Sequence, residues 1–259
     1  MPDVTAPDPA WPDDLAQPGT PRAHTPADVA ELARSAHTTR QLQARWSVCE
    51  ACPRLVAFRR SAAAAVPHAY RGQPYWARPV PATGAEFPRV LIVGLSPSAH
   101  GGNRTGSNLV GDSSGEFLFD SLRRTGLATD GDCDRRRMPA VRIVPVVACA
   151  PPGNRPTPAE LACCGGWVGR QLELALPALG AVVILGQVAW TSWWTTVRAS
   201  GTWPDAVLPK FAHGAVVRTA NRPPVYGCYH PSRQNTATGR LTPAMLDAVL
   251  AAAAVGLSV

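Results

Sequence analysis

The chain has 259 residues, which is enough for one well-buried domain with a tail. Only 17% of the residues are charged, yet the formal net charge is +7 and nearly every basic residue is an arginine. No apolar run is long enough to span a bilayer, and the acidic, Pro-rich start Met1–Pro26 lacks the apolar core of a secretory signal. These features argue against a membrane or secreted protein, and we expect a soluble, cytoplasmic one. The basic balance suits a polyanion such as nucleic acid, although charge alone does not establish that partner.

The first part of the chain is predicted to contain a tail, a helix and a loop. Residues 1–24 are expected to form a disordered, Pro-rich tail because they supply little to bury, and residues 25–259 a single domain. Thr25–Asp28 has the pattern of a helix start, with a Thr cap, a Pro in the first turn and an acid three residues on. It predicts a helix of about 20 residues that runs to Trp46. The segment Gly72–Pro88, rich in Gly, Pro and aromatics, is expected to be a long surface loop.

The rest of the chain alternates short apolar runs with helical segments. The predicted strands are Val90–Leu95, Ile143–Val147, Ala181–Leu185, Ala215–Val217 and a last one near Val225–Tyr229. The predicted helices are Gly115–Thr125, Pro158–Leu176, Gly186–Ala199 and one from about Pro243. Continuous β-branched runs separated by helices are typical of parallel strands buried on both faces. We therefore predict an α/β fold, a three-layer α/β/α sandwich around a mainly parallel four-stranded sheet, with ligands beyond the C-terminal ends of the strands.

Seven cysteines in a chain predicted to be intracellular need an explanation other than disulfides. Cys49 and Cys52 form a C-x2-C pair, which alone fits zinc, a redox dithiol, an iron–sulfur ligand or chance. Cys149 follows a predicted strand, and Cys163 and Cys164 lie on the helix after it; these two cannot both be assumed to be ligands, because adjacent helical side chains diverge by about 100°. Four converging thiolates suit zinc or a [4Fe–4S] cluster, and spacing does not choose between them. The remaining cysteines, without partner spacing, are expected to be structural: Cys133 and Cys228.

Three segments that follow predicted strands carry unusual residues. Gly94–Gly106 is a glycine-rich turn that allows a ligand to approach the backbone closely, and Asp112 lies shortly beyond it. The second segment contains Asn154, which by itself is explained equally well as a turn residue. The third, Tyr229–Asn235, contains His230, and a lone histidine is more often structural than functional.

Together and in this order, the segments resemble the uracil-DNA glycosylase superfamily. The nearest group is family 5, or type B, which is similar to family 4 in carrying an iron–sulfur cluster. The resemblance runs from about Cys49 to the C-terminal helix, and these segments carry it: Tyr75–Pro81, Gly94–Gly106, Cys149–Asn154, Pro209–Gly214 and Tyr229–Thr242. It implies a base excision repair enzyme that flips uracil out of DNA and cleaves its N-glycosidic bond, with deaminated purines such as hypoxanthine or xanthine as further candidate substrates. The implied partner is double-stranded DNA with a damaged base, single-stranded DNA being a second form, and a monomer suffices at one lesion.

The resemblance also favours a [4Fe–4S] cluster over zinc. It implies four ligands: Cys49, Cys52, Cys149 and Cys164. Cys164 is preferred to Cys163 because the family pattern places a bulky residue three positions after its last cysteine, as Trp167 stands here. In such enzymes the cluster is structural, and no redox chemistry is expected in base removal.

The same resemblance implies roles in catalysis. His230 donates a hydrogen bond to the departing base and stabilises its negative charge, and Asn154 reads the edge of the base with both a donor and an acceptor. Asp112 orients the attacking water, with Ser96 as the alternative holder of that water. The residues expected to contact the base or the DNA backbone are Gly94, Leu95, Ser96, Leu109, Ser232 and Asn235.

Three positions depart from the family pattern. Leu109 stands where relatives place a Phe that stacks on the flipped base, Ala237 where an aromatic is usual, and Ala148 where Arg usually precedes the cysteine. A looser pocket is consistent with weak uracil excision or with room for a purine. The alternatives are a catalytically weak homologue that acts as a DNA-binding module, and another α/β hydrolase or nucleoside-binding enzyme, against which the cysteines argue. A zinc deaminase is excluded, because no His-x-Glu occurs together with Pro-Cys-x-x-Cys.

Overall fold

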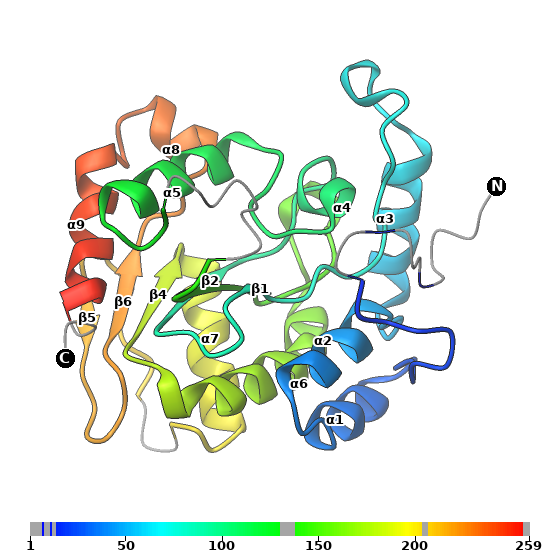
Figure 1. The fold of residues 1–259 in the computed structure, drawn as a ribbon, viewed down its shortest axis with the longest axis horizontal. Coiled ribbons are helices and arrows are strands. Elements are labelled where there is room, and N and C mark those ends of the chain that lie inside the picture. The colour runs from blue at the N-terminus through cyan, green and yellow to red at the C-terminus, as the bar shows by residue number, and fades with distance from the viewer. Residues whose placement is uncertain (1–6, 8–10, 12–13, 130–137, 204–206, 256–259) are drawn as a thin grey trace.

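A computed structural model describes residues 7, 11, 14–129, 138–203 and 207–255 (Figure 1). The described residues form one six-stranded sheet with the strand order β1-β3-β2-β4-β6-β5. The strands are β1 (Thr83–Gly84), β2 (Val90–Gly94), β3 (Val141–Pro145), β4 (Ala181–Leu185), β5 (Val216–Val217) and β6 (Val225–Cys228). The inner strands β3, β2, β4 and β6 pair in parallel, whereas β1 and β5 pair antiparallel at the two edges.

The parallel core of the sheet confirms the predicted α/β architecture, with two corrections at its edges. The run Ala215–Val217 was expected to be a buried parallel strand, but β5 is a short antiparallel edge strand whose Val216 is exposed. The two strands are antiparallel because the chain leaves β5, reverses direction and returns beside it as β6. Strand β1 was not predicted, because two residues carry no periodic pattern.

Helices cover both faces of the sheet, as Figure 1 shows. Helices α5 (Ser113–Arg124) and α9 (Pro243–Ala254) pack together on one face, where Val90 and Ile92 join their core. Leu91 and Val93 point into the opposite core, so alternate residues of β2 serve the two faces. That second core is covered by α1 (Pro26–Arg34), α2 (Thr39–Ser47), α6 (Pro158–Ala175) and α7 (Gln187–Ala199). The three-layer α/β/α sandwich is thereby confirmed.

The predicted helix from Thr25 to Trp46 is in fact two helices. Thr38 caps α2 by accepting a hydrogen bond from the Gln41 backbone N–H, which starts a new helix four residues after α1 ends. A further long helix, α3 (Pro53–Ala64), follows the C-x2-C pair and was not predicted. The remaining short helices are η1 (His68–Tyr70), α4 (Gly102–Thr105), η2 (Pro152–Asn154), η3 (Leu176–Ala178) and α8 (Arg233–Ala237).

Two segments expected to lie outside the core are partly buried in it. Residues 14–24 of the predicted disordered tail pack against the domain: Ala16 and Ala23 are buried, and the Asp14 carboxylate pairs with the Arg78 guanidinium. The predicted surface loop Gly72–Pro88 contributes the buried Trp76, whose indole N–H donates to Pro79 O at 2.9 Å. Short apolar side chains and one ion pair fix these segments, although neither segment shows a periodic pattern.

None of the helices in the described part of the chain has the length and apolar character that a membrane span requires.

Candidate active site and cysteine pocket

The three sequence segments singled out above meet at one edge of the sheet. Each follows a parallel strand: the first two segments begin side by side at the ends of β2 and β3, and the third begins at the end of β6, on the far side of β4. The β2–β3 ladder extends past the strands, because Val146 N donates to Gly94 O at 2.9 Å and Val147 N donates to Leu95 O at 3.0 Å. The backbone of the glycine-rich loop is therefore held in register with the segment that carries Asn154.

An open cavity of about 310 Å³ lies at this edge. Two residues with predicted catalytic roles, Asp112 and Asn154, line it. Further lining comes from Ser98 and His100 of the glycine-rich loop, from Phe58 on α3 and from Tyr70 on η1. A carboxylate and an amide thus share one concave, partly aromatic surface, which is the composition of a small-molecule or nucleobase site.

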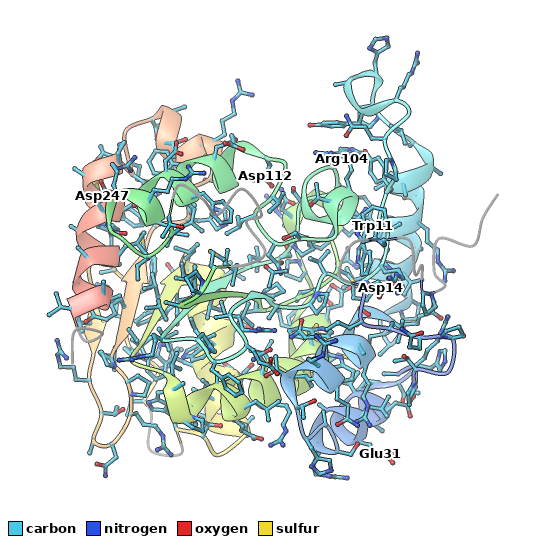
Figure 2. All side chains as sticks on the ribbon, in the orientation of Figure 1. Trp11, Asp14, Glu31, Arg104, Asp112 and Asp247 are labelled. Carbon is cyan, nitrogen blue, oxygen red and sulfur yellow. The ribbon has the colours of Figure 1, made fainter. Side chains whose placement is uncertain are left out.

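The Asp112 carboxylate has a hydrogen bond on each oxygen. Asp112 is the N-cap of α5, and its Oδ1 accepts from Gly115 N at 3.0 Å. Its Oδ2 accepts from the Ser98 hydroxyl at 2.7 Å. Figure 2 shows Asp112 at the beginning of α5. Sequence reasoning offered Ser96 as the serine of the site, but the hydroxyl that contacts this carboxylate belongs to Ser98.

His230 lies between β6 and α8, on a turn whose backbone is stabilised by hydrogen bonds of Ser232 and Asn235. Asn235 Nδ2 donates to His230 O at 2.8 Å, and the Ser232 hydroxyl caps α8 by accepting from Asn235 N at 3.4 Å. Burial lowers the pKa of His230 below its ordinary value, while the charge of Asp112 acts in the opposite direction. The ring is therefore neutral near pH 7, and the carboxylate is close enough to influence it.

Asn154 ends the single turn η2 in the left-handed region, with φ of 56°. Its side chain is exposed and contributes to the cavity wall. Gly153 before it is also left-handed, with φ of 59°, as the Pro-Gly-Asn turn requires. Asn154 can therefore be both a turn residue and part of the cavity wall.

Several predicted site residues do not line this cavity. Of the described residues, its lining excludes His230, Leu109 and Ser96. Leu109 has φ of 56° and packs partly against the core under α5 and α9. Ser232 and Asn235 were expected to touch DNA, and the structure shows them bonded within their own turn.

Tyr70 and His100, which line the cavity, belong to an aromatic and cationic group that the sequence analysis missed. The Arg104 guanidinium lies over the Tyr70 ring at 4.4 Å and donates from Nε to His100 O at 2.8 Å. His100 also stacks on Tyr70 at 6.1 Å between ring centroids, and its Nδ1 shares a hydrogen bond of 3.0 Å with Tyr75 OH. The signal in the sequence is the histidine inside the glycine-rich loop, together with the tyrosines before it. Their contact depends on the projecting α3–η1 segment, which was not predicted.

A second pocket, lined mainly by apolar side chains, brings five cysteines together beneath α3. Its lining includes Cys49, Cys52, Cys149, Cys163 and Cys164, along with Trp46 and Trp167. No carboxylate or imidazole of the described residues is part of it. The C-x2-C pair, the strand end and helix α6 therefore converge as the spacing predicted.

Burial raises the pKa of the thiols in this pocket. It raises the pKa of Cys49 to about 12 and that of Cys149 to about 11, and it raises the pKa of Cys164 well above its ordinary value. The pKa of Cys52 is also raised; the largest cause is a hydrogen bond with Cys163, and burial is the second. Among the described residues, no three or more His, Cys, Asp or Glu side chains are arranged to hold a single metal ion.

The other two cysteines do not belong to this pocket. Cys228 is fully buried in β6, and burial raises its pKa to about 12, in keeping with the structural role expected for it. Cys133 lies outside the described residues.

Comparison with known proteins agrees with this geometry. Residues 81–254 match the profile of the family described as "Uracil DNA glycosylase superfamily". The chain is 46% identical over 220 residues to the type-5 uracil-DNA glycosylase of Mycobacterium tuberculosis, covering 83% of this chain and 81% of the relative. It is 42% identical over 207 residues to the type-5 uracil-DNA glycosylase of Thermus thermophilus, covering 79% and 91%. The chain belongs to the uracil DNA glycosylase superfamily, among its type-5 uracil-DNA glycosylases.

Proposed function

We propose that the protein removes uracil from DNA by hydrolysing the N-glycosidic bond. The observation that carries this proposal is the cavity at the C-terminal edge of the sheet, where the Asp112 carboxylate and the Asn154 amide share one surface. Its support from outside the structure is the similarity to relatives named type-5 uracil-DNA glycosylases. The substrate is a nucleotide turned out of the base stack, because the glycosidic bond is inaccessible within a duplex.

Cleavage builds positive charge on the deoxyribose and negative charge on the departing base. The Asp112 carboxylate, fixed by Ser98 and by the start of α5, would face the developing positive charge and orient a water for attack on the sugar. His230 would donate a hydrogen bond from its neutral ring to an oxygen of the leaving base. The ring is a neutral donor because burial lowers the pKa of His230.

Recognition of the base is assigned to Asn154 and the glycine-rich loop. An exposed amide on the cavity wall can donate to and accept from the edge of uracil at the same time. Ser232 and Asn235 position His230 through its backbone, and we propose that they contact the DNA strand only secondarily. Backbone groups around Gly94 and Leu95 add contacts to the base. We further propose that one protein copy acts on one lesion in double-stranded DNA, which light scattering of the free protein and of its DNA complex tests.

We also propose that the cysteine pocket holds a [4Fe–4S] cluster with the ligands Cys49, Cys52, Cys149 and Cys164. The donor set fits, because the pocket offers thiols without oxygen or imidazole ligands. Zinc would draw four sulfurs to about 2.3 Å from one ion. Four thiolates suit either group, and the resemblance to family 5 is what favours the cluster over zinc. When bound, the cluster supplies rigidity to the loops around Cys49 and Cys149.

The test of the proposed activity is single-turnover cleavage of labelled duplexes that carry uracil, hypoxanthine or xanthine. We expect wild-type protein to leave abasic sites at uracil, His230→Ala to lose about 10²–10³-fold in rate as a lost transition-state donor, and Asn154→Ala to lose about 10-fold. His37→Ala is the matched control, since His37 is exposed between α1 and α2. Cleavage of the purine lesions would extend the substrate range. Binding of every duplex with no cleavage would refute the glycosylase proposal and leave the DNA-binding module.

A further inference from the structure

Arg59, on α3, is a buried cation with most of its guanidinium unpaired. Its side chain is 1% exposed, and neither Nε nor Nη1 has a hydrogen-bond partner among the described residues. Only Nη2 has contacts, to Cys49 O at 3.5 Å and to the Glu50 carboxylate at 3.9 Å. A buried charge without a close counter-charge is destabilising, so such a residue needs a reason to be there.

The nearest carboxylate does not neutralise Arg59. Glu50 lies 2.9 Å from Arg60 and 3.8 Å from Arg22, so three arginines share one acid. Arg60 has the shortest contact and is itself 44% exposed, while Arg59 stands further from the acid and inside the protein. This end of α3 therefore carries an excess of positive charge that the described protein groups leave uncompensated.

Arg59 adjoins the cysteine pocket, because its Nη2 lies 3.5 Å from the backbone oxygen of Cys49, whose side chain lines that pocket. The indole N–H groups of Trp46 and Trp167, two stacked rings that line this pocket, also have no hydrogen-bond partner among the described residues. Buried donors around one pocket without an acceptor indicate an anionic occupant.

We propose that Arg59 is the counter-charge of the cluster, a positioning residue that helps to hold the cluster in the cysteine pocket by offsetting its negative charge. This inference rests on the proposed [4Fe–4S] cluster. Four thiolates around such a core leave a net charge of about −2, which a nearby buried guanidinium offsets. Arg59 thereby fixes how firmly the cluster is held and at what potential it is reduced, without touching DNA.

The experiment compares Arg59→Met with Arg60→Met in the full-length protein. Both variants remove one arginine next to Glu50, but only Arg59 is buried and contacts the backbone oxygen of Cys49. The readouts are iron and sulfide content, the rate at which visible absorbance is lost in air, and the reduction potential by electrochemistry. We expect Arg59→Met to lose its iron about 10-fold faster than wild type and to show a more negative reduction potential. Arg60→Met and Arg59→Lys should stay close to wild type.

A second variant covers the case in which Arg59→Met does not fold. Glu50→Gln removes the shared carboxylate and leaves Arg59 in place, so the potential should shift to a more positive value. Equal iron retention and potential in Arg59→Met and wild type would overturn the inference, as would an unshifted potential in Glu50→Gln. Failure of the cluster proposal itself looks different: wild-type protein, purified and reconstituted without oxygen, would then hold no iron.

Discussion

At the active-site edge, the orientation of Asp112 is set by two donors from different parts of the chain. Gly115 N holds Oδ1 as part of the helix cap, and the Ser98 hydroxyl holds Oδ2. The helix N-terminus favours a negative charge at this position. The carboxylate therefore keeps its direction before any substrate binds, which is what a group that acts on a developing positive charge requires.

Removing the Ser98 hydroxyl tests this preorganisation. A hydrogen bond to a charged group contributes about 1.5–3 kcal/mol, so Ser98→Ala should reduce the single-turnover rate of uracil excision by about 10-fold or more. Ser96→Ala should keep the wild-type rate, because the hydroxyl that donates to the Asp112 carboxylate belongs to Ser98. If Ser96→Ala lost activity and Asp112→Asn kept it, the attacking water would belong to Ser96 instead.

The pKa of His230 offers a second test at the level of single residues. Burial lowers this pKa and the Asp112 charge partly restores it, so Asp112→Asn should lower it further. The unfolded chain would take up the same proton near pH 6.5. Because the folded state binds it only at lower pH, this residue's contribution to stability is present above about pH 6.5 and declines as the pH falls below it. NMR titration of the His230 ring, assigned with His230→Ala, measures the shift; a higher pKa in Asp112→Asn would contradict the assignment.

Among the elements, the start of α5 controls the shape of the loop before it. The loop crosses from Leu109, in the left-handed region, to the cap at Asp112, and its backbone then lies against the first turn of the helix. A Cβ placed on Gly115 would lie 1.7 Å from Leu109 O. Glycine is required here by close approach of two backbones, since its own φ is not left-handed.

Gly115→Ala should therefore be strongly destabilising although it lies in a helix. We expect a loss of about 3 kcal/mol in the free energy of unfolding, as for overpacking against backbone. The matched control is Gly169→Ala in α6, where the nearest atom to the new Cβ, Ser200 Cβ, would be 3.4 Å away. That change should be neutral or slightly stabilising because Ala is the better helix former. Urea unfolding of both variants measures the two free energies of unfolding. Equal values would contradict the prediction and would show that the loop at Leu109 moves to make room for the new Cβ.

For the whole molecule, the N-terminal segment acts as part of the domain. Asp14 reaches the Arg78 guanidinium, and both side chains are nearly inaccessible, at 1% and 2% exposure. Burial lowers the pKa of Arg78, and Asp14 opposes this effect. Arg78 also lies over the Trp76 ring at 3.8 Å. The pair connects the start of the chain to the segment that precedes the sheet.

Asp14→Asn should leave a buried cation without its counter-charge. Breaking a buried ion pair from one side costs about 3–5 kcal/mol, so the variant should unfold at markedly lower urea concentration. Asp120→Asn is the control, since its pair with Arg123 is exposed at 56% and 33% and contributes at most about 1 kcal/mol. Similar midpoints for the two variants would mean that the N-terminal segment is not held through this pair.

Much of the fold could be predicted from local pattern. The β-branched runs predicted the four inner strands, and the helix predicted over Pro158–Leu176 is α6. Because parallel strands end at a common edge, the same pattern predicted that the glycine-rich loop and the segment of Asn154 would lie together. Periodicity, caps and strand ends are local properties, so a single sequence is sufficient to reveal them.

The sequence by itself determined the layered α/β architecture, the edge at which the site lies and the segments that bring the cysteines together. Only the tertiary structure decided that Ser98 and not Ser96 holds Asp112, that Tyr70 and His100 line the cavity, and that Arg59 is buried with two of its three guanidinium nitrogens unpaired. The physical reason is distance along the chain. Such contacts join side chains whose positions depend on how whole elements pack, and neither propensity nor spacing encodes that packing.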